Sequence, residues 1–144
     1  MATRERLREW ADNGREQGIA LFRIAVGVLF LSHGMSNVFG LFGKEAAEFL
    51  AWPGWWAGII QLVAGVLVAL GTGTRTAALV ASGSMACAYF VAHQPKGLLP
   101  LENGGVPAAL YAWAFFVLVF TGPGAWAVES LRSRGRIASE APSG

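Results

Sequence analysis

Two histidines and a few side-chain amides are the residues of this sequence that could do chemistry inside an otherwise apolar chain. His33 and Asn37 lie in the stretch LFLSHGMSNVFG, and Gln61 and His93 lie in or beside later apolar runs. Histidine transfers protons near neutral pH, and amides donate hydrogen bonds to ligand carbonyl groups. These four residues are therefore candidates for a ligand pocket, although His33 could equally fasten two helices through a hydrogen bond.

The stretch ENGG, residues 102–105, adds Glu102 and Asn103 as candidates, because it could form a polar lid over the pocket or an ordinary turn. Two histidines could in principle ligate a haem from two sides. His93, however, stands beside Gln94 and Pro95 in an expected interfacial loop, so a haem is not expected. We assign no catalytic residue, and we expect neither a metal site nor a covalently bound cofactor.

The composition indicates a membrane protein. Hydrophobic residues make up 54% of the 144 residues and charged residues only 14%, whereas ordinary globular domains have about 45–50% and about 25%. A soluble protein of this size could not bury so much apolar surface. The single cysteine, Cys87, excludes an intramolecular disulfide and a paired-cysteine redox centre, and we expect it to fill the core.

Four apolar runs are candidates for membrane-spanning helices. The first is long enough to cross a bilayer, while the other three fall short of the ~20 residues that a spanning helix usually needs. The runs cover residues 18–39, 55–70, 76–92 and 106–120. The sequence therefore predicts an all-α integral membrane four-helix bundle.

The basic residues predict its orientation. With the N- and C-termini both cytoplasmic, nine of the eleven lysines and arginines lie on the cytoplasmic side, as the positive-inside rule requires. We interpret Arg23 and Arg75 as anchors at this inner face, with the Arg23 side chain reaching the membrane surface. Lys44 and Lys96 fall on the outer side. Charges that flank apolar runs are topology signals, so we expect no nucleic-acid partner. The predicted location is the bacterial cytoplasmic (inner) membrane.

The chain divides into three expected segments. Residues 1–17 form a charged head, which is either a short interfacial helix or a solvated charged run. Residues 18–130 form the membrane domain, and residues 131–144 form a basic and then disordered cytoplasmic tail.

Small and polar residues mark the helix faces that should meet inside the bundle. Membrane helices associate through close approach of small residues and through polar contacts. We therefore predict that Gln61 contacts the first run near His33 or Asn37. The two faces carry Gly27, Gly34 and Asn37 in the first run and Gly58, Gln61 and Gly65 in the second.

Four stretches resemble the DoxX family of small four-span bacterial membrane proteins: RIAVGVLFLSHGMSNVFG, GIIQLVAGVLVALGTGTRTAAL, SGSMACAYF and PLENGGVPAALYAWAFFVLVFTGPGAW. The resemblance covers about residues 19–130 and consists of glycine and arginine landmarks. It implies a membrane subunit of a thiosulfate:quinone oxidoreductase, or assembly with thiol- or superoxide-detoxifying partners. Asn37 stands where the family often has lysine, and Gln61 where it often has glutamate. Exchanging both charges for amides avoids leaving one unpaired charge in the membrane.

The favoured function is that of a membrane subunit in a quinone-linked redox or oxidative-stress system. A quinone headgroup would lie near His33, Asn37, Gln61 and His93, with electrons supplied by a partner. The alternative is a non-catalytic scaffold that recruits soluble detoxification enzymes. A small-solute carrier ranks third, because the sequence shows no internal repeat and no broken helix. Besides the lipid bilayer, the expected partners are soluble redox or detoxification enzymes, and the chain could form a homo- or hetero-oligomer.

Overall fold

The computed structural model describes residues 2–133, and these residues form helices joined by turns and loops, with no strand among them. The helical elements are α1 (Ala2–Phe39), α2 (Gly54–Leu70), α3 (Thr74–Ala88), η1 (Tyr89–His93), η2 (Gln94–Lys96), α4 (Pro100–Asn103) and α5 (Val106–Thr121). A further helical turn covers residues 128–133. The prediction of an all-α fold is confirmed. Most of the tail predicted for residues 131–144 lies outside the described residues.

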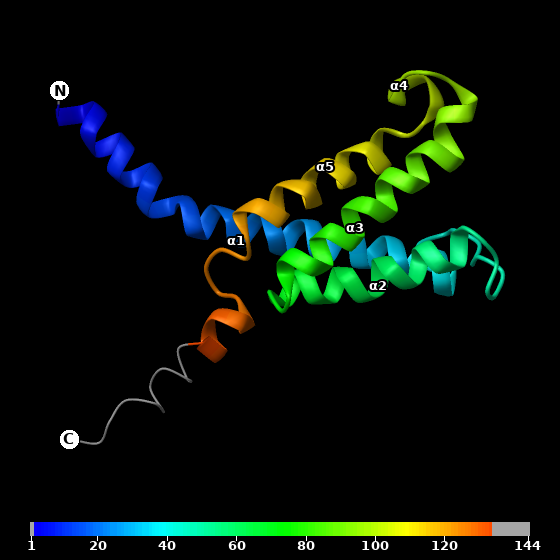
Figure 1. The fold of residues 1–144 in the computed structure, drawn as a ribbon, viewed down its shortest axis with the longest axis horizontal. Coiled ribbons are helices and arrows are strands. Elements are labelled where there is room, and N and C mark those ends of the chain that lie inside the picture. The colour runs from blue at the N-terminus through cyan, green and yellow to red at the C-terminus, as the bar shows by residue number, and fades with distance from the viewer. Residues whose placement is uncertain (1, 134–144) are drawn as a thin grey trace.

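The four long helices form two antiparallel hairpins, α1 with α2 and α3 with α5, and α2 also packs on α3 (Figure 1). Aromatic rings link the two hairpins, since the Phe30 and Phe115 ring centroids lie 4.6 Å apart. We call the end of the bundle that carries loops 40–53 and 94–105 the loop end. The opposite end, with the 71–73 turn and residues 122–133, is the terminal end (Figure 1).

Glycines allow α1 and α2 to pack closely. A methyl group added at Gly34 would lie 2.7 Å from the Leu62 backbone nitrogen, and one at Gly65 would lie 2.7 Å from the Leu31 backbone nitrogen. A methyl group at Gly27 would meet the backbone of α2 at the same distance. No carbon can approach another atom so closely, so these glycines set the separation of the two helices. The predicted small-residue faces are confirmed.

Two helical segments, Gly14–Phe39 and Thr74–Lys96, are long and apolar enough to cross a membrane. The apolar helices Gly54–Leu70 and Val106–Thr121 are shorter. The four segments correspond to the four predicted apolar runs.

Large apolar side chains are exposed along the outside of the helices, among them Leu29, Val63, Leu79 and Leu110. Soluble proteins rarely expose a large contiguous apolar surface, so this surface suits contact with a lipid bilayer. Cys87 is also exposed, and the expectation that it fills the core is wrong. Periodicity explains the difference, because Met85, two positions earlier on the same helix, is the residue that faces the core.

The described part of the predicted head, residues 2–17, continues the first helix without a break. It therefore does not form a separate short helix. Its Leu7 and Trp10 side chains are exposed, and this segment extends beyond the bundle at the terminal end (Figure 1).

An arginine closes each hairpin at the terminal end. Arg23 on α1 donates from Nη1 to the carbonyl oxygens of Val68 (2.8 Å) and Ala69 (2.6 Å), the last turn of α2. Arg75 on α3 donates from Nη1 to two carbonyl oxygens in the last turn of α5, at 2.6 and 2.9 Å. Each guanidinium thus caps the negative end of the helix dipole of its partner helix.

The two hairpins are built alike around these arginines. The capped carbonyls lie 45 and 46 residues after Arg23 and 44 and 45 residues after Arg75. Helix α2 ends in LVALGTG, residues 67–73, and α5 ends in LVFTGPG, residues 118–124; both glycines of each stretch have positive φ. The two hairpins thus share a plan that the sequence, in which we found no internal repeat, does not reveal. The reason is that the features common to both hairpins are confined to one arginine and one glycine-containing turn in each.

Candidate ligand pocket at the loop end

A cavity of about 250 Å³ lies at the loop end, and residues of both hairpins line it. This volume is just below the ~300 Å³ at which sites for drug-sized ligands begin, so the cavity suits a headgroup rather than a whole long-chain ligand. Apolar side chains, including Phe30 and Met85, form part of its wall. Its polar lining consists of His33 from α1, Lys44 from the loop after α1, Gln61 from α2, His93 from η1 and Tyr111 from α5.

A chain of hydrogen bonds orients the amide of Gln61. Lys44 Nζ donates to Asn37 Oδ1, and Asn37 Nδ2 donates to Gln61 Oε1 at 2.8 Å. An ammonium group can only donate, so the oxygen of Asn37 must face Lys44 and its nitrogen must face Gln61. Gln61 consequently uses its oxygen in the chain and keeps its amide nitrogen as a donor for the cavity that it lines. The predicted contact between Gln61 and the first helix is confirmed.

His33 and Tyr111, which both line the cavity, are in contact through their rings. The two ring centroids lie 5.5 Å apart at 80°, an edge-to-face arrangement. The side-chain hydrogen bonds of residues 2–133 leave the His33 ring without a protein partner, and Tyr111 adds a hydroxyl group that can donate or accept. The cavity thus offers two groups that can exchange a proton with a bound ligand.

His93 is held in place at the far wall of the cavity. Its Nδ1 lies 3.2 Å from the Asn103 carbonyl oxygen, and its ring stacks on Tyr89 at a centroid distance of 6.5 Å. The π-helical turn η1 carries both rings. Because Nδ1 faces a carbonyl oxygen, Nδ1 carries the proton in the neutral ring, and Nε2 is left as the acceptor.

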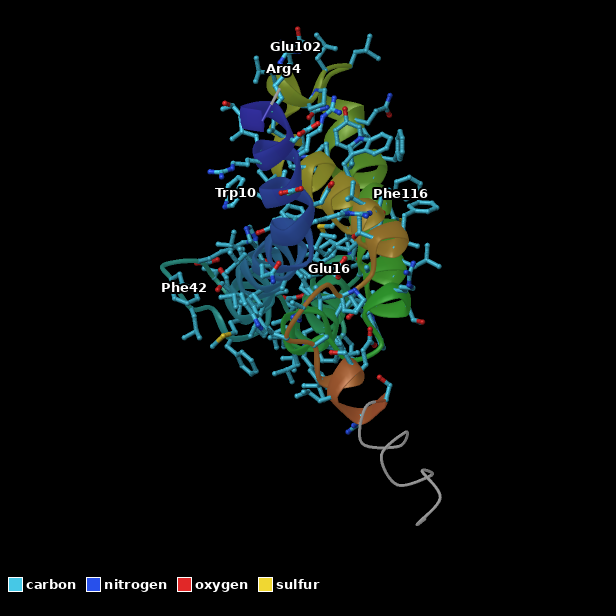
Figure 2. The ribbon with its side chains drawn as sticks, turned by 90° about the vertical axis from the view of Figure 1, so that its left-hand side faces the viewer. Arg4, Trp10, Glu16, Phe42, Glu102 and Phe116 are labelled. Atoms are coloured by element: carbon cyan, nitrogen blue, oxygen red, sulfur yellow. The ribbon has the colours of Figure 1, made fainter. Side chains whose placement is uncertain are left out.

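Asn103 is a buried residue that organises the second loop. Its Nδ2 donates to the Gly97 carbonyl oxygen at 2.9 Å, and its Oδ1 accepts from the Gly105 backbone nitrogen at 2.8 Å. Glu102 is exposed at the tip of the α3–α5 hairpin (Figure 2) and does not line the cavity. Of the ENGG stretch, Gly104 contributes to the cavity wall.

The structure thus brings His33, Gln61 and His93 together around one cavity and places Asn37 directly behind Gln61. Sequence reasoning missed Lys44 and Tyr111. Lys44 lies in the loop after α1, and helical periodicity does not predict in which direction a loop side chain points. Tyr111 had a detectable signal, since it is the one residue with a hydroxyl group between Val106 and Phe120.

Arg23 and Arg75 lie at the terminal end, away from the cavity. The expectation that Arg23 reaches the membrane surface is wrong, because its side chain is fully buried. Its guanidinium also donates to carbonyl oxygens of the segment after α5, from Nε to Pro123 at 2.7 Å and from Nη2 to Ala125 and Trp126 at 3.4 Å. Arg75 remains exposed.

The charge of the cavity lining is one-sided. Among the described lining residues there is one ammonium group, from Lys44, and no carboxylate. Lys44 is bonded to the neutral amide oxygen of Asn37 rather than to an acidic side chain. Such a lining favours a ligand group that accepts hydrogen bonds, such as a carbonyl oxygen or an oxyanion.

Comparison with known proteins agrees with the architecture. The sequence model of the DoxX family matches residues 18–94. An uncharacterized protein of Haemophilus influenzae is 37% identical over 122 residues, which cover 78% of this chain and 88% of that protein. No solved structure matches the chain. The matched segment contains α2, α3, both closing arginines and four of the five polar residues of the cavity, all except Tyr111. On this basis the chain belongs to the DoxX family, whose members are membrane proteins.

Proposed function

We propose that this chain crosses the bacterial inner membrane four times, with both termini in the cytoplasm, and that its cavity holds the headgroup of a quinone. In this view it is the membrane subunit of a quinone-linked redox or oxidative-stress system. The observation that carries the proposal is the cavity itself, where His33, Gln61 and Tyr111 from three helices converge with Lys44. A quinone supplies the redox chemistry, since it takes up electrons and protons together.

The residues of the cavity have complementary tasks in this proposal. The Gln61 amide nitrogen and the Lys44 ammonium donate hydrogen bonds to a headgroup oxygen, because both are fixed as donors by the chain that runs through Asn37. His33 and Tyr111 hold and transfer protons. The apolar wall around Phe30 and Met85 packs on the ring and excludes water. The electrons come from a partner protein, since the cavity lining offers no electron carrier.

Two observations support four spans in this orientation: the pairing of short with long helices, and the distribution of basic residues between the two ends of the bundle. Each short apolar helix, α2 or α5, packs antiparallel to a helical segment long enough to span the membrane. The described basic residues at the terminal end include Arg8, Arg15 and Arg132, whereas Lys44 and Lys96 lie at the loop end. The positive-inside rule then puts the terminal end in the cytoplasm and the cavity near the outer surface.

One observation favours the scaffold as a second candidate. The first part of α1 extends beyond the bundle and exposes Arg4, Arg6, Arg8 and Arg15 (Figure 1). An exposed charged helix at the cytoplasmic face could hold a soluble redox or detoxification enzyme. This role is compatible with quinone binding, because the partner would be the source of electrons.

Equilibrium binding of a radiolabelled short-chain quinone to the purified full chain in lipid nanodiscs tests the proposal. His33→Ala and Gln61→Leu should each weaken binding about 10-fold or more, because each removes a hydrogen bond made in an apolar site. Leu118→Ala, which truncates a fully buried side chain outside the cavity, controls for loss of stability, and lipid-facing Leu29→Ala controls for mutation of α1. Unchanged affinity in both cavity variants would refute the quinone site.

A further inference from the structure

Both loops at the loop end expose large apolar side chains. In the loop between α1 and α2, Phe42 is 75% exposed, Phe49 76% and Trp52 71%. In the second loop, Leu98 is 78% exposed and Leu101 87%. Figure 2 shows Phe42 pointing away from the helices. We refer to these five residues as the collar. Water is an unfavourable environment for so many exposed apolar side chains on two loops at the same end of the bundle.

The lengths of the helices indicate what covers the collar. With 17 residues, α2 is about 26 Å long, and with 16 residues α5 is about 24 Å long. The hydrocarbon core of a bilayer is ~30 Å thick, so each helix is several Å too short. Residues beyond the helix ends must make up the difference.

At the terminal end, the residues that directly follow the two helices supply little apolar length. There α2 ends in the turn Gly71–Gly73 and α5 ends at Gly122, and Arg75 lies exposed beside them. At the loop end, by contrast, the exposed apolar surface of the helices runs directly into the loops, through Trp56 on α2 and Leu110 on α5.

We propose that the collar is inserted into the outer leaflet of the bilayer, so that the mouth of the cavity opens at the level of the lipid headgroups. The amphipathic ring of Trp52 is well suited to this depth. Lys44 belongs to the same loop as Phe42, but it lines the cavity, and an ammonium group is stable at headgroup depth. A ligand then reaches the cavity from the lipid phase. Its chemical class is an amphiphile, with an apolar tail in the leaflet and a headgroup that accepts hydrogen bonds.

The identity of that headgroup rests on the proposed function, whereas the depth of the collar does not. Spin-label measurements on the full chain in vesicles of phosphatidylethanolamine and phosphatidylglycerol separate the two. Cys87 is first replaced by alanine, and a single nitroxide-labelled cysteine is then placed at residue 42, 49 or 101. Residue 63 serves as the reference for lipid, because Val63 is exposed on α2. Residue 102 serves as the reference for water, because Glu102 is charged and exposed beside Leu101.

At the three collar positions, oxygen should relax the label more strongly than a water-soluble nickel chelate does, as at residue 63. At residue 102 the order should be reversed. Greater relaxation by the nickel chelate at residues 42, 49 and 101 would place the collar in water and overturn the inference. Protection from both reagents would also overturn it, because a protein would then cover the collar. No quinone is present in this experiment, so a collar found in water leaves the binding result for His33→Ala unaffected.

Discussion

Arg23 shows how this bundle buries a charge by bonding it to backbone carbonyl oxygens, with no acidic side chain among its hydrogen-bond partners in the described part of the chain. A guanidinium has five N–H groups, and Arg23 directs all five hydrogen bonds at backbone carbonyl oxygens of two segments far apart in sequence. Three of these carbonyls belong to the segment after α5, about 100 residues away. No periodicity in the sequence could predict such partners, which is why the surface position expected for Arg23 was wrong.

Replacing Arg23 by lysine should destabilise the protein by about 1–3 kcal/mol, because a lysine cannot reach all of these carbonyls and leaves some buried without a donor. Thermal unfolding in mild detergent measures the effect. Arg75→Lys is the matched control and should cost less, since Arg75 is exposed and water can replace it. Equal losses in the two variants would contradict the role of Arg23 in joining α2 to the segment after α5.

The amide pair tests a second part of the account at the residue scale. A double-mutant cycle with Asn37→Leu and Gln61→Leu should give a coupling free energy of about 0.6 kcal/mol, the average for a hydrogen bond between membrane helices. Ser32→Ala provides the control in place of Asn37→Leu, because the Ser32 hydroxyl bonds within its own helix. Additive effects of the two leucine substitutions would show that the Asn37–Gln61 bond does not hold the helices together.

The sequence predicted the contact between Asn37 and Gln61, but not that Lys44 joins the same chain of hydrogen bonds. Asn37 and Gln61 follow from helical periodicity, since each lies on the face that also carries glycines. Lys44 reaches Asn37 because the chain reverses direction after α1, with Gly40 and Phe42 both at positive φ. Phenylalanine rarely adopts that conformation, so the reversal is not visible in the residue types. Of the polar residues that line the cavity, the sequence thus predicted His33, Gln61 and His93, but neither Lys44 nor Tyr111.

At the scale of the elements, the closeness of α1 and α2 determines where the cavity residues stand. Gly65→Ala should destabilise the protein by about 1–3 kcal/mol, the usual cost of overpacking, because the new methyl group would lie 2.7 Å from the Leu31 backbone nitrogen. Gly83→Ala is the matched control on α3, where no atom lies within 4 Å of the new methyl group. In detergent, this variant should unfold at or above the wild-type temperature, since alanine favours a helix over glycine. A loss of stability in both variants would point to a general intolerance of alanine rather than to close packing.

The four apolar runs were predicted well because hydrophobic length is a strong signal. The pairing into two arginine-closed hairpins was not. This pairing depends on hydrogen bonds between an arginine and carbonyl oxygens 44 to 46 positions later. Apart from the glycine turns, no sequence motif marks the residues that form them. This structural repeat weakens one argument against a carrier, but it leaves the cavity and its donors as the feature that any function must explain.

At the scale of the whole molecule, orientation in the membrane is the feature that can be tested without any ligand. In a Cys87→Ala background, single cysteines at residues 44 and 96 should react in intact cells with a maleimide that cannot cross the inner membrane. A cysteine at residue 72, in the turn after α2, should react only after the membrane is broken. Labelling of residue 72 in intact cells together with protection of residues 44 and 96 would invert the proposed topology.

The central claim is that the cavity between the two hairpins holds a quinone headgroup, and photoaffinity labelling with an azido-quinone tests it most directly. After illumination of the full chain in lipid nanodiscs, mass spectrometry should find the label on α1 around His33 and on α5 around Tyr111, and excess unlabelled quinone should abolish it. Attachment confined to the apolar groove between α2 and α3, lined by Ile59 and Val80, would contradict the claim, as would labelling near His33 that unlabelled quinone fails to displace.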